Sequence, residues 1–397
     1  MSGTPKNPYG PGAATPPLHL AGREPQLTRF PKILKAAPEI PANVRLTGLR
    51  GVGKTVLLKE FERLAKDEGW AVARHQVEPR HNGEEALSQF LRQTTQGAMA
   101  RMSRTRRVRE QIAGAVEAGR RLLAVSFEDI TLSLGGNTKV EADLSKSLYD
   151  AVEGALDSGH EGFALLLDEA QVIRDDTGRN GQYPMSMFIA AVNALQEAGL
   201  PIALVLCGLP TLAANLQRAR TYSERMFRGE QIGALQGNPG PARDAFVQPL
   251  AGTGIEAEEE LVSRVLSEVE GYPFFIQLWG AELWDAAQDA GTDRFTLRLL
   301  DAIESDIYAR LDVEFYAGRI DTLTPSEQDL VLATATCPYP PLRTADIRSR
   351  SAKSDGNINV LMGRLTEQGV IFRVQKGLYE YTAPKFHEYL RRRSPNP

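Results

Sequence analysis

The chain of 397 residues contains only two cysteines, Cys207 and Cys337. Two cysteines exclude a disulfide framework and a cysteine-rich metal site. The five histidines are scattered, which argues against a zinc cage and against a histidine-dependent catalytic cluster. No apolar run approaches the roughly 20 residues that span a bilayer, and the N-terminus lacks the apolar core of a signal peptide. We therefore expect a reduced, cytoplasmic protein without a membrane partner.

The sequence also lacks a strong excess of charge of either sign. It has 46 Lys and Arg residues against 50 Asp and Glu residues, for a net charge of -4. A protein that coats nucleic acid or an anionic membrane with its whole surface is therefore excluded, whereas a local basic patch is not. The length predicts two or three domains with cores of their own.

Strands and helices are predicted to alternate in the first part of the chain. Short apolar runs at 44–47, 163–167 and 202–207 are typical of strands buried on both faces of a parallel sheet. Apolar residues at helical spacing predict helices from about Thr55 to Gly69 and over 185–198. This alternation predicts an α/β domain.

Composition and pattern divide the chain further. Residues 1–19 are rich in Pro and Gly, and we expect a disordered tail there. The α/β domain is predicted over 20–235, with an insertion at about 80–145 that carries an Arg-rich helical stretch (101–121) and a hairpin before Asn137. Helices over 258–270, 274–287 and 295–315 predict a helical domain at 236–315. Residues 316–397 form the last predicted domain.

The segment Gly48–Thr55 fits the phosphate-loop pattern G-x-x-x-x-G-K-[ST]. The glycines allow main-chain N–H groups to converge on phosphate oxygens, Lys54 reaches the β- and γ-phosphates, and Thr55 offers a hydroxyl to Mg²⁺. A plain Gly-rich turn would not need Lys and Thr after the glycines. The predicted nucleotide-binding residues here are Gly48, Arg50, Gly51, Val52, Gly53, Lys54, Thr55 and Val56.

A pair of carboxylates follows the apolar run 163–167. The strand would deliver Asp168 and Glu169 to the carboxyl edge of the sheet, where ligands bind in open α/β folds. We expect Asp168 to hold Mg²⁺ through water and Glu169 to polarise the water that attacks the γ-phosphate. The alternative is a strand that simply ends at the surface. The next strand ends at Cys207, where we predict core packing and assign no polar sensing residue.

These residues resemble P-loop ATPases of the AAA+/STAND type, close to the origin-recognition-like and archaeal-ATPase-like groups. Gly22-Arg23-Glu24 resembles a motif that lies against adenine in this group, and Gly271-Tyr272-Pro273 resembles its lid motif. The resemblance implies a P-loop NTPase fold, a three-layer α/β/α parallel sheet of order 5-1-4-3-2 with a helical lid and a C-terminal winged helix. It implies ATP and Mg²⁺ as cofactors and adds Gly22, Arg23, Tyr272 and Pro273 to the nucleotide-binding residues.

The chain departs from the resemblance at two places. The segment 271–274 lacks the arginine that related initiators use as a second sensor of nucleotide. Arg225 stands where related ATPases carry an arginine finger for a neighbouring subunit, with Arg228 as the alternative. An ordinary solvated arginine on a helix surface is the competing interpretation of both.

The last 82 residues are predicted to be a winged helix: helices, one of them over 357–368, precede strands at 370–374 and 378–382. Residues 316–397 hold 12 Lys and Arg against 8 Asp and Glu. Ile358, Leu361 and Leu365 would be buried, whereas Asn357, Asn359, Arg364 and Lys376 would face duplex DNA. Packing on the protein's own ATPase domain or on another protein is the alternative.

We therefore predict slow Mg²⁺-dependent ATP hydrolysis, with Glu169, Lys54 and Arg225 as the catalytic residues and Thr55 and Asp168 as the metal ligands. Two interpretations stay open. The protein is either a DNA-associated ATPase of initiator or transposition-helper type, or a signalling or defence switch that does not bind DNA. ATP or ADP, duplex DNA, a second copy of the chain and another protein are the partners considered.

Overall fold

The computed structural model describes residues 6–12, 15–113, 127, 138–176, 181–220, 223–236 and 240–394. The chain forms two compact units. The first unit comprises Met1–Arg23, Gly48–Gly53 and Ile232–Pro397, and the second comprises Glu24–Thr47 and Lys54–Gln231. The phosphate loop is where the chain passes from the first unit to the second.

The second unit is built on a five-stranded sheet in the order β2-β3-β4-β1-β5, and all neighbouring strands are parallel. The sheet order 5-1-4-3-2 that the resemblance implied is thereby confirmed. The strands are β1 (Ala42–Thr47), β2 (Ala71–Gln76), β3 (Phe163–Asp168), β4 (Ile202–Gly208) and β5 (Arg228–Gln231). Every residue of β3 and β4 is buried, as their continuous apolar sequences predict for strands covered on both faces.

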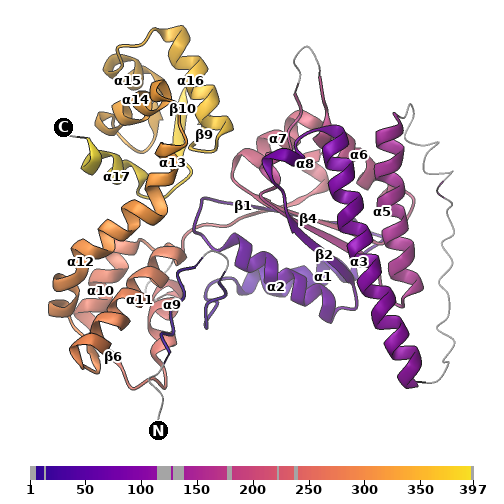
Figure 1. Ribbon diagram of the computed structural model, residues 1–397, viewed down its shortest axis with the longest axis horizontal. Helices are drawn as coiled ribbons and strands as arrows, with labels where there is room; N and C mark the ends of the chain where they lie inside the picture. The colour runs from indigo at the N-terminus through magenta and orange to yellow at the C-terminus, as the bar shows by residue number, and fades with distance from the viewer. Residues whose placement is uncertain are drawn as a thin grey trace. The chain divides into compact units, whose positions relative to one another are not determined.

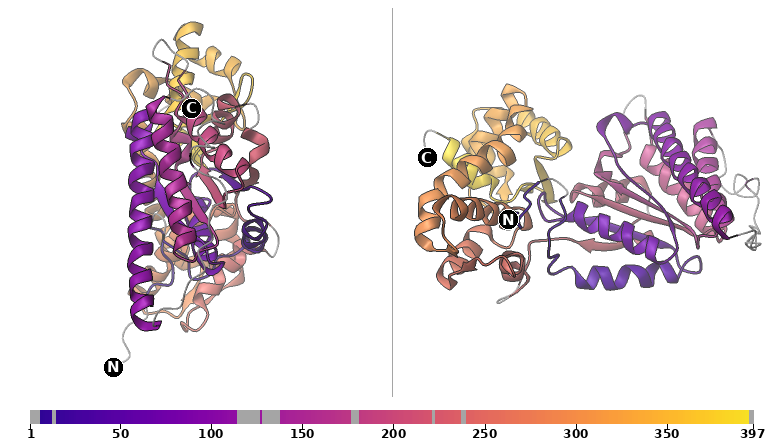
Figure 2. Two further views of the ribbon diagram at one scale, coloured as in Figure 1. Left: turned by 90° about the vertical axis from the view of Figure 1, so that its right-hand side faces the viewer. Right: turned by 60° about the horizontal axis from the view of Figure 1, so that its bottom comes forward.

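Helices cover both faces of this sheet, so the predicted three-layer α/β/α architecture is confirmed (Figure 1). Helices α1 and α2 lie on one face, and α3, α5 and α6 lie on the other, as the turned views also show (Figure 2). The helices of the second unit are α1 (Glu24–Lys35), α2 (Lys54–Asp67), α3 (Glu84–Ala113), α5 (Lys139–Asp157), α6 (Pro184–Glu197), α7 (Thr211–Ala219) and α8 (Ser223–Met226).

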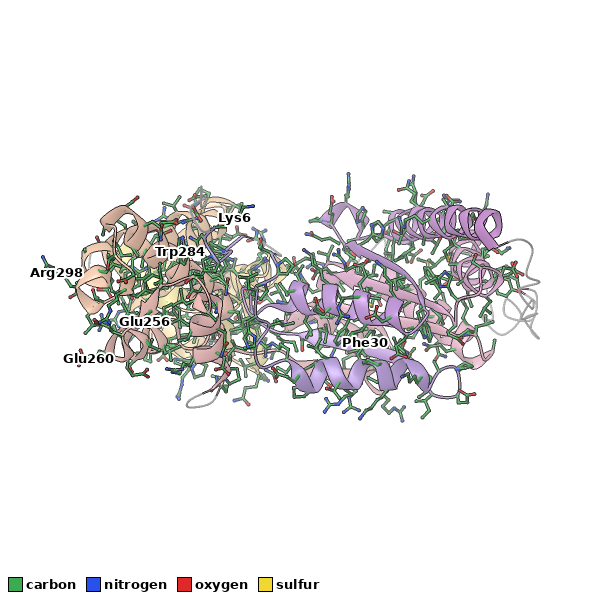
Figure 3. All side chains as sticks on the ribbon, turned by 90° about the horizontal axis from the view of Figure 1, so that it is seen from below. Lys6, Phe30, Glu256, Glu260, Trp284 and Arg298 are labelled. Atoms are coloured by element: carbon green, nitrogen blue, oxygen red, sulfur yellow. The ribbon has the colours of Figure 1, made fainter. Side chains whose placement is uncertain are left out.

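The apolar face of α2 forms as its sequence predicts. Leu57 and Phe61 are buried. Gly69, just after the helix, has a φ of +81°, which prevents the helix from continuing. The Phe61 ring stacks on Phe30 of α1 with centroids 4.0 Å apart. Phe30 is labelled on its helix in Figure 3. This packing fixes the helix that begins at the phosphate loop against the sheet.

The chain between β2 and β3 is longer than an ordinary connection. It contributes α3 and α5, whose buried faces join the core of the same sheet through residues such as Leu87, Leu91, Leu144 and Leu148. The predicted insertion therefore contributes part of the helical layer on one face of the sheet. The Arg-rich side chains beyond Ser103 and the predicted hairpin before Asn137 lie outside the described residues.

The first unit is mainly helical, and a single hydrophobic core runs from Tyr9 to Leu390. At the boundary predicted at 315–316, which stays a prediction, α12 continues through a π-helix (Asp312–Ala317) directly into α13. Its first helices are α9 (Pro241–Val247), α10 (Glu259–Val269), α11 (Pro273–Ala290), α12 (Leu297–Leu311) and α13 (Gly318–Asp321), with the short parallel strands β6 (Glu256–Ala257) and β7 (Arg294–Phe295).

The expectation of a disordered tail is wrong for residues 6–12. Tyr9 is only 5% exposed, lies within the core of the first unit and donates its hydroxyl hydrogen to the Phe246 carbonyl at 2.5 Å. Asn7 donates to the Ala281 carbonyl at 3.1 Å. One buried aromatic ring and a few long-range hydrogen bonds hold this segment, and its Pro- and Gly-rich composition gives no sign of them.

The C-terminal segment follows with four α-helices and a small antiparallel sheet of order β8-β10-β9. Its elements are α14 (Pro325–Ala333), β8 (Leu342–Arg343), α15 (Thr344–Arg350), α16 (Asp355–Glu367), β9 (Ile371–Gln375), β10 (Leu378–Tyr381) and α17 (Phe386–Arg393). Ile358, Leu361 and Leu365 of α16 are buried, as predicted.

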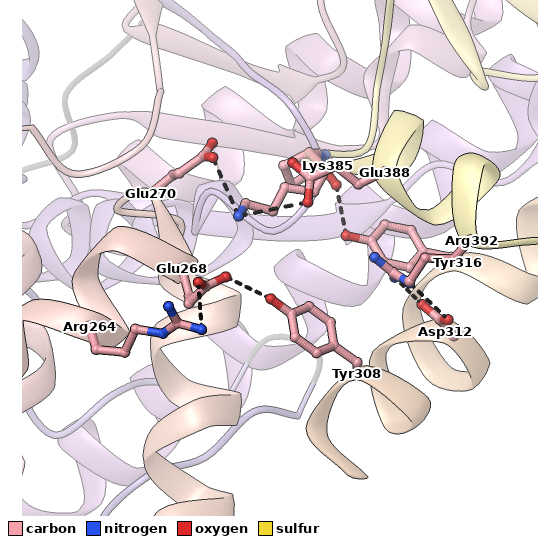
Figure 4. A network of polar contacts seen from close by, with 10 residues as sticks. Arg264, Glu268, Glu270, Tyr308, Asp312, Tyr316, Lys385, Glu388 and Arg392 are labelled. Atoms are coloured by element: carbon pink, nitrogen blue, oxygen red, sulfur yellow. Dashed lines mark hydrogen bonds and ion pairs between the residues drawn. The ribbon is translucent and has the colours of Figure 1, made fainter. Parts of the chain in front are cut away.

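A polar network ties α17 to the helices before it (Figure 4). The Tyr308 hydroxyl donates to Glu268 at 2.6 Å, and Lys385 pairs with Glu270 at 3.3 Å. Arg392 of α17 pairs with Asp312 of the π-helix. Within the described part of the chain, no helix combines the length and the apolar character that crossing a bilayer requires.

Candidate functional site

The phosphate loop has the backbone that its glycines predict. Gly51 and Gly53 have φ angles of +78° and +86°, values that side chains with a Cβ disfavour. A Cβ on Gly48 would lie 2.1 Å from the Ile232 carbonyl oxygen, so no larger residue fits there. A Cβ on Gly53 would meet nothing within 4 Å, so the loop is open at that point. An open turn of this kind fits a phosphate group.

Three contacts within the first unit hold the loop in place. Gly51 accepts a hydrogen bond through its carbonyl from the Phe274 N–H at 3.1 Å. Arg50 donates its main-chain N–H to the Thr382 carbonyl at 2.9 Å, which connects the loop to the C-terminal segment. Arg23 is buried and donates through Nη2 to the Val52 carbonyl at 3.0 Å. The loop is thus fixed by elements from both ends of the chain.

Lys54 and Thr55 open α2 in the second unit. The Thr55 hydroxyl donates to Oδ2 of Asp168 at 2.6 Å, although the two residues are 113 positions apart. Asp168 is 5% exposed and Lys54 is 8% exposed. A hydroxyl beside a carboxylate is the kind of oxygen pair that suits Mg²⁺, so these two side chains fit the metal that the sequence predicts.

Glu169 lies in a strained conformation directly after β3. Its φ of +53° places it in the left-handed region, and its N–H donates to Oδ1 of Asp168 at 2.9 Å. The left-handed turn directs the Glu169 carboxylate away from the path of the strand. Strain of this kind is found where the surrounding structure holds a functional side chain in place.

Gln171 holds that carboxylate and was not predicted from the sequence. Its Nε2 donates to Oε2 of Glu169 at 2.6 Å, and its Oε1 accepts from the Leu209 N–H at 3.0 Å. The Gln171 carbonyl in turn accepts from Asn215 at 2.9 Å. The glutamine therefore links the carboxylate to the end of β4.

Gly208 makes room for this link. A Cβ at position 208 would lie 2.3 Å from Oε1 of Gln171. The sequence contains both residues of this link: the glutamine in the order Asp-Glu-Ala-Gln at 168–171, and the glycine that ends β4. They can be connected only when it is known that β3 and β4 are neighbouring strands.

Cys207 is completely buried at the end of β4, which agrees with the prediction of core packing. Burial is the main cause that raises the pKa of its thiol, and the charge of Asp168 raises it further. The thiol is therefore neutral and lies close enough to Asp168 to interact with it. It is a weak donor at a position where no polar sensing residue was assigned.

The other predicted residues are spread over both units. Val56 is half-buried in the first turn of α2. Gly22 has a φ of +68°, and Tyr272 and Pro273 begin α11, all in the first unit. Arg225 is exposed on α8 in the second unit, whereas Arg228 pairs with Glu230 at 3.2 Å. Of the two arginines proposed as a finger for a neighbouring subunit, Arg225 is thus the one without an ion pair among the described residues.

The sequence of residues 19–203 matches the family of the AAA ATPase domain. The match includes β1 to β3, the phosphate loop and the two carboxylates, and it ends inside β4. A second match, to a domain of unknown function, covers residues 313–390. No curated protein matches the chain.

Solved structures agree with the fold of the AAA ATPase domain. A Walker-type ATPase of Pyrococcus abyssi superposes with a TM-score of 0.54 and 16% sequence identity, covering 94% of this chain and 96% of the other. The Aeropyrum pernix ORC2 protein in its ADP form gives a TM-score of 0.51 and 14% identity, with 97% and 98% coverage. At these identities the likeness establishes the fold, and the predicted P-loop NTPase fold is confirmed.

Proposed function

We propose that the protein binds ATP with Mg²⁺ and hydrolyses it, and that its nucleotide state changes a contact with DNA or with a protein partner. The observation that carries the proposal is the hydrogen bond of 2.6 Å between Thr55 and Asp168. It joins the end of the phosphate loop to the carboxylate at the end of β3, which are the two places that supply metal ligands in P-loop enzymes.

The protein's own groups have separate roles in binding and hydrolysis. The main-chain N–H groups of residues 48–55 and the Lys54 ammonium bind the phosphates, and Thr55 and Asp168 hold the metal. The metal supplies positive charge that neutralises the phosphate oxygens. Glu169 accepts a proton from the attacking water, and Gln171 orients its carboxylate through the hydrogen bond of 2.6 Å.

A pair of variants tests binding and turnover separately. Lys54→Ala should abolish ATP binding, because the phosphates lose their positive partner. Glu169→Gln should keep ATP binding and stop turnover, because an amide cannot accept the proton. Lys32→Ala and Glu153→Gln replace exposed residues of the same unit and should change neither quantity. Equal turnover in Glu169→Gln and the unaltered protein would refute the role of Glu169.

DNA contact is the finer part of the proposal. We propose that the C-terminal segment is a winged helix, since α14, β8, α15, α16 and the hairpin β9–β10 occur in that order. Asn357, Asn359 and Arg364 are exposed along α16, and Lys376 is exposed in the turn of the hairpin. Exposed side chains of these types can contact bases and phosphates in a groove.

A nucleotide-gated switch without DNA binding is the second candidate. The hydrogen bond from the Arg50 N–H to the Thr382 carbonyl favours it. Through this bond, a nucleotide bound at the phosphate loop would directly affect the C-terminal segment. Binding to duplex DNA that weakens steeply with salt supports the first candidate. Assembly that depends on nucleotide, without affinity for DNA, supports the second.

A further inference from the structure

The N-terminal segment 6–12 is bound between α9 and α11 of its own unit, and its indigo trace lies beside them in Figure 1. Tyr9 is the only large apolar side chain of the segment. Its ring lies 6.0 Å from the ring of Phe246 in α9 and belongs to the core of the unit. A segment with so little apolar surface stays in place only if specific contacts hold it.

Gly280 makes room for the Tyr9 ring. A Cβ on Gly280 would lie 2.4 Å from a carbon of that ring, and the three atoms nearest to that position all belong to it. Gly280 is buried in the middle of α11, where glycine is less favourable than alanine. The missing side chain at this position therefore serves one purpose in the structure, which is to admit the ring.

Polar groups along one face of α11 bind the residues on either side of Tyr9. Oε1 of Gln277, a residue that is 8% exposed, accepts from the Gly10 N–H at 3.0 Å. Asn7 donates through Nδ2 to the Ala281 carbonyl at 3.1 Å and to Oδ1 of Asp285 at 2.9 Å. The α11 residues are four positions apart, so they share one face of the helix.

The segment also holds its own shape. Oδ1 of Asn7 accepts from the Tyr9 N–H at 3.0 Å, which closes a local turn. Pro8, between them, has a fixed φ angle. A segment ordered by its own side chain and by a proline loses less freedom when it binds. Residues 7–10 therefore carry both the turn and the groups that α9 and α11 contact.

We propose that α9 and α11 form a binding site for a peptide of the sequence Asn-Pro-Tyr-Gly, and that the chain fills this site with its own residues 7–10. Because the segment is tethered to the site, its effective concentration there is high, and the unaltered protein has no room for a second peptide. A free peptide of the same sequence binds once the tethered copy lacks its tyrosine.

The filled site supports the phosphate loop from two sides. Phe274, at the start of α11, donates its N–H to the Gly51 carbonyl. Arg23, at the other end of the N-terminal segment, donates to the Val52 carbonyl at 3.0 Å. The bound segment thus connects the two groups that hold the loop, and its loss should weaken ATP binding. This consequence rests on the proposed binding of ATP, whereas the peptide site does not.

The test is calorimetry of the full chain carrying Tyr9→Ala with a synthetic peptide of residues 6–12. One peptide should bind per chain and raise the melting temperature of the variant. The unaltered protein should bind none, and a peptide that carries Tyr9→Ala should bind neither protein. Absence of binding to the variant overturns the proposal. If the variant does not fold alone, the peptide should recover folded protein when present during refolding, and failure to do so overturns the proposal as well.

Gly280→Ala shows whether the peptide occupies this site. In the unaltered protein it should lower the melting temperature, because its Cβ meets the Tyr9 ring. In the Tyr9→Ala protein it should not lower the melting temperature, because the ring is absent, but it should abolish peptide binding. Gly363→Ala, whose Cβ would meet nothing within 4 Å, is the control in both proteins. Equal peptide affinity with and without Gly280→Ala overturns the site.

ATP affinity separates this inference from the proposed function. If the unaltered protein binds ATP, Tyr9→Ala should weaken that binding and the peptide should restore it. A peptide that binds without changing ATP affinity overturns the link to the loop and leaves the proposed function intact. If the unaltered protein does not bind ATP, the proposed function fails, and peptide binding still decides whether the site exists.

Discussion

Replacing Gln171 tests how the Glu169 carboxylate is held. Gln171→Ala removes the donor at 2.6 Å from Oε2 of Glu169 and leaves the side chain free to adopt other rotamers. A hydrogen bond to a charged group contributes about 1.5–3 kcal/mol, and about 1.4 kcal/mol corresponds to a factor of ten. We therefore expect kcat for ATP hydrolysis to fall at least about tenfold, with KM nearly unchanged because Gln171 does not contact the phosphate loop.

Gln171→Glu separates orientation from charge. A second carboxylate facing Glu169 repels it and cannot donate a hydrogen bond to Oε2, so kcat should fall further than in Gln171→Ala. Single-turnover hydrolysis of the two variants measures this difference. Gln93→Ala, at an exposed position of α3, is the control.

The replacement has a structural cost that must be measured beside the rate. Gln171→Ala leaves the Leu209 N–H without its acceptor, so the melting temperature should fall as well. Rates are therefore compared well below the melting temperature of every variant. A kcat that stays the same or rises in Gln171→Ala would refute the reasoning, because the glutamine would then be irrelevant to the carboxylate or would restrain it.

Three further predictions concern other contacts. Gly208→Ala should lower kcat as Gln171→Ala does, because its Cβ would lie 2.3 Å from Oε1 of Gln171. The control is Gly363→Ala, which should leave kcat unchanged because its Cβ would meet nothing within 4 Å. Phe61→Ala should cost about 3–5 kcal/mol in urea unfolding, because its buried ring stacks at 4.0 Å on a ring of α1; a loss below about 1 kcal/mol would contradict the packing. Burial lowers the pKa of the His387 imidazole. The free energy of unfolding should therefore be highest above the ordinary pKa of histidine, and it should decrease as the pH falls from that value toward the lowered pKa. His387→Gln should show a smaller fall in melting temperature between pH 7.5 and pH 5.5, and an equal fall would exclude His387 as a cause.

Local pattern was enough to predict the elements that carry the phosphate chemistry. Gly51 and Gly53 allow the positive φ angles of the loop because they have no Cβ. The continuous apolar run before Asp168 is typical of a strand buried on both faces of a parallel sheet. The spacing of Ile358, Leu361 and Leu365 likewise places them on one side of a helix. In these segments the signal and the structure depend on residues close together in the sequence.

The resemblance to a known family supplied what local pattern could not. The order of the five strands depends on which distant segments pair, and periodicity carries no information about that choice. The sheet order 5-1-4-3-2 was expected from the family and is observed. The predicted roles of Arg225, Tyr272 and Pro273 came from the same source and stay predictions.

The sequence by itself therefore determined the phosphate loop, the paired carboxylates and the α/β class. Only the tertiary structure decided that Tyr9 packs in the core of the first unit, that Gln171 reaches the end of β4, and that the Arg50 N–H donates to the Thr382 carbonyl. The physical reason is the same in each case. Each contact joins residues that are far apart in the sequence. A single glutamine, arginine or tyrosine belongs to no periodic pattern, so the sequence does not indicate which residue it will contact.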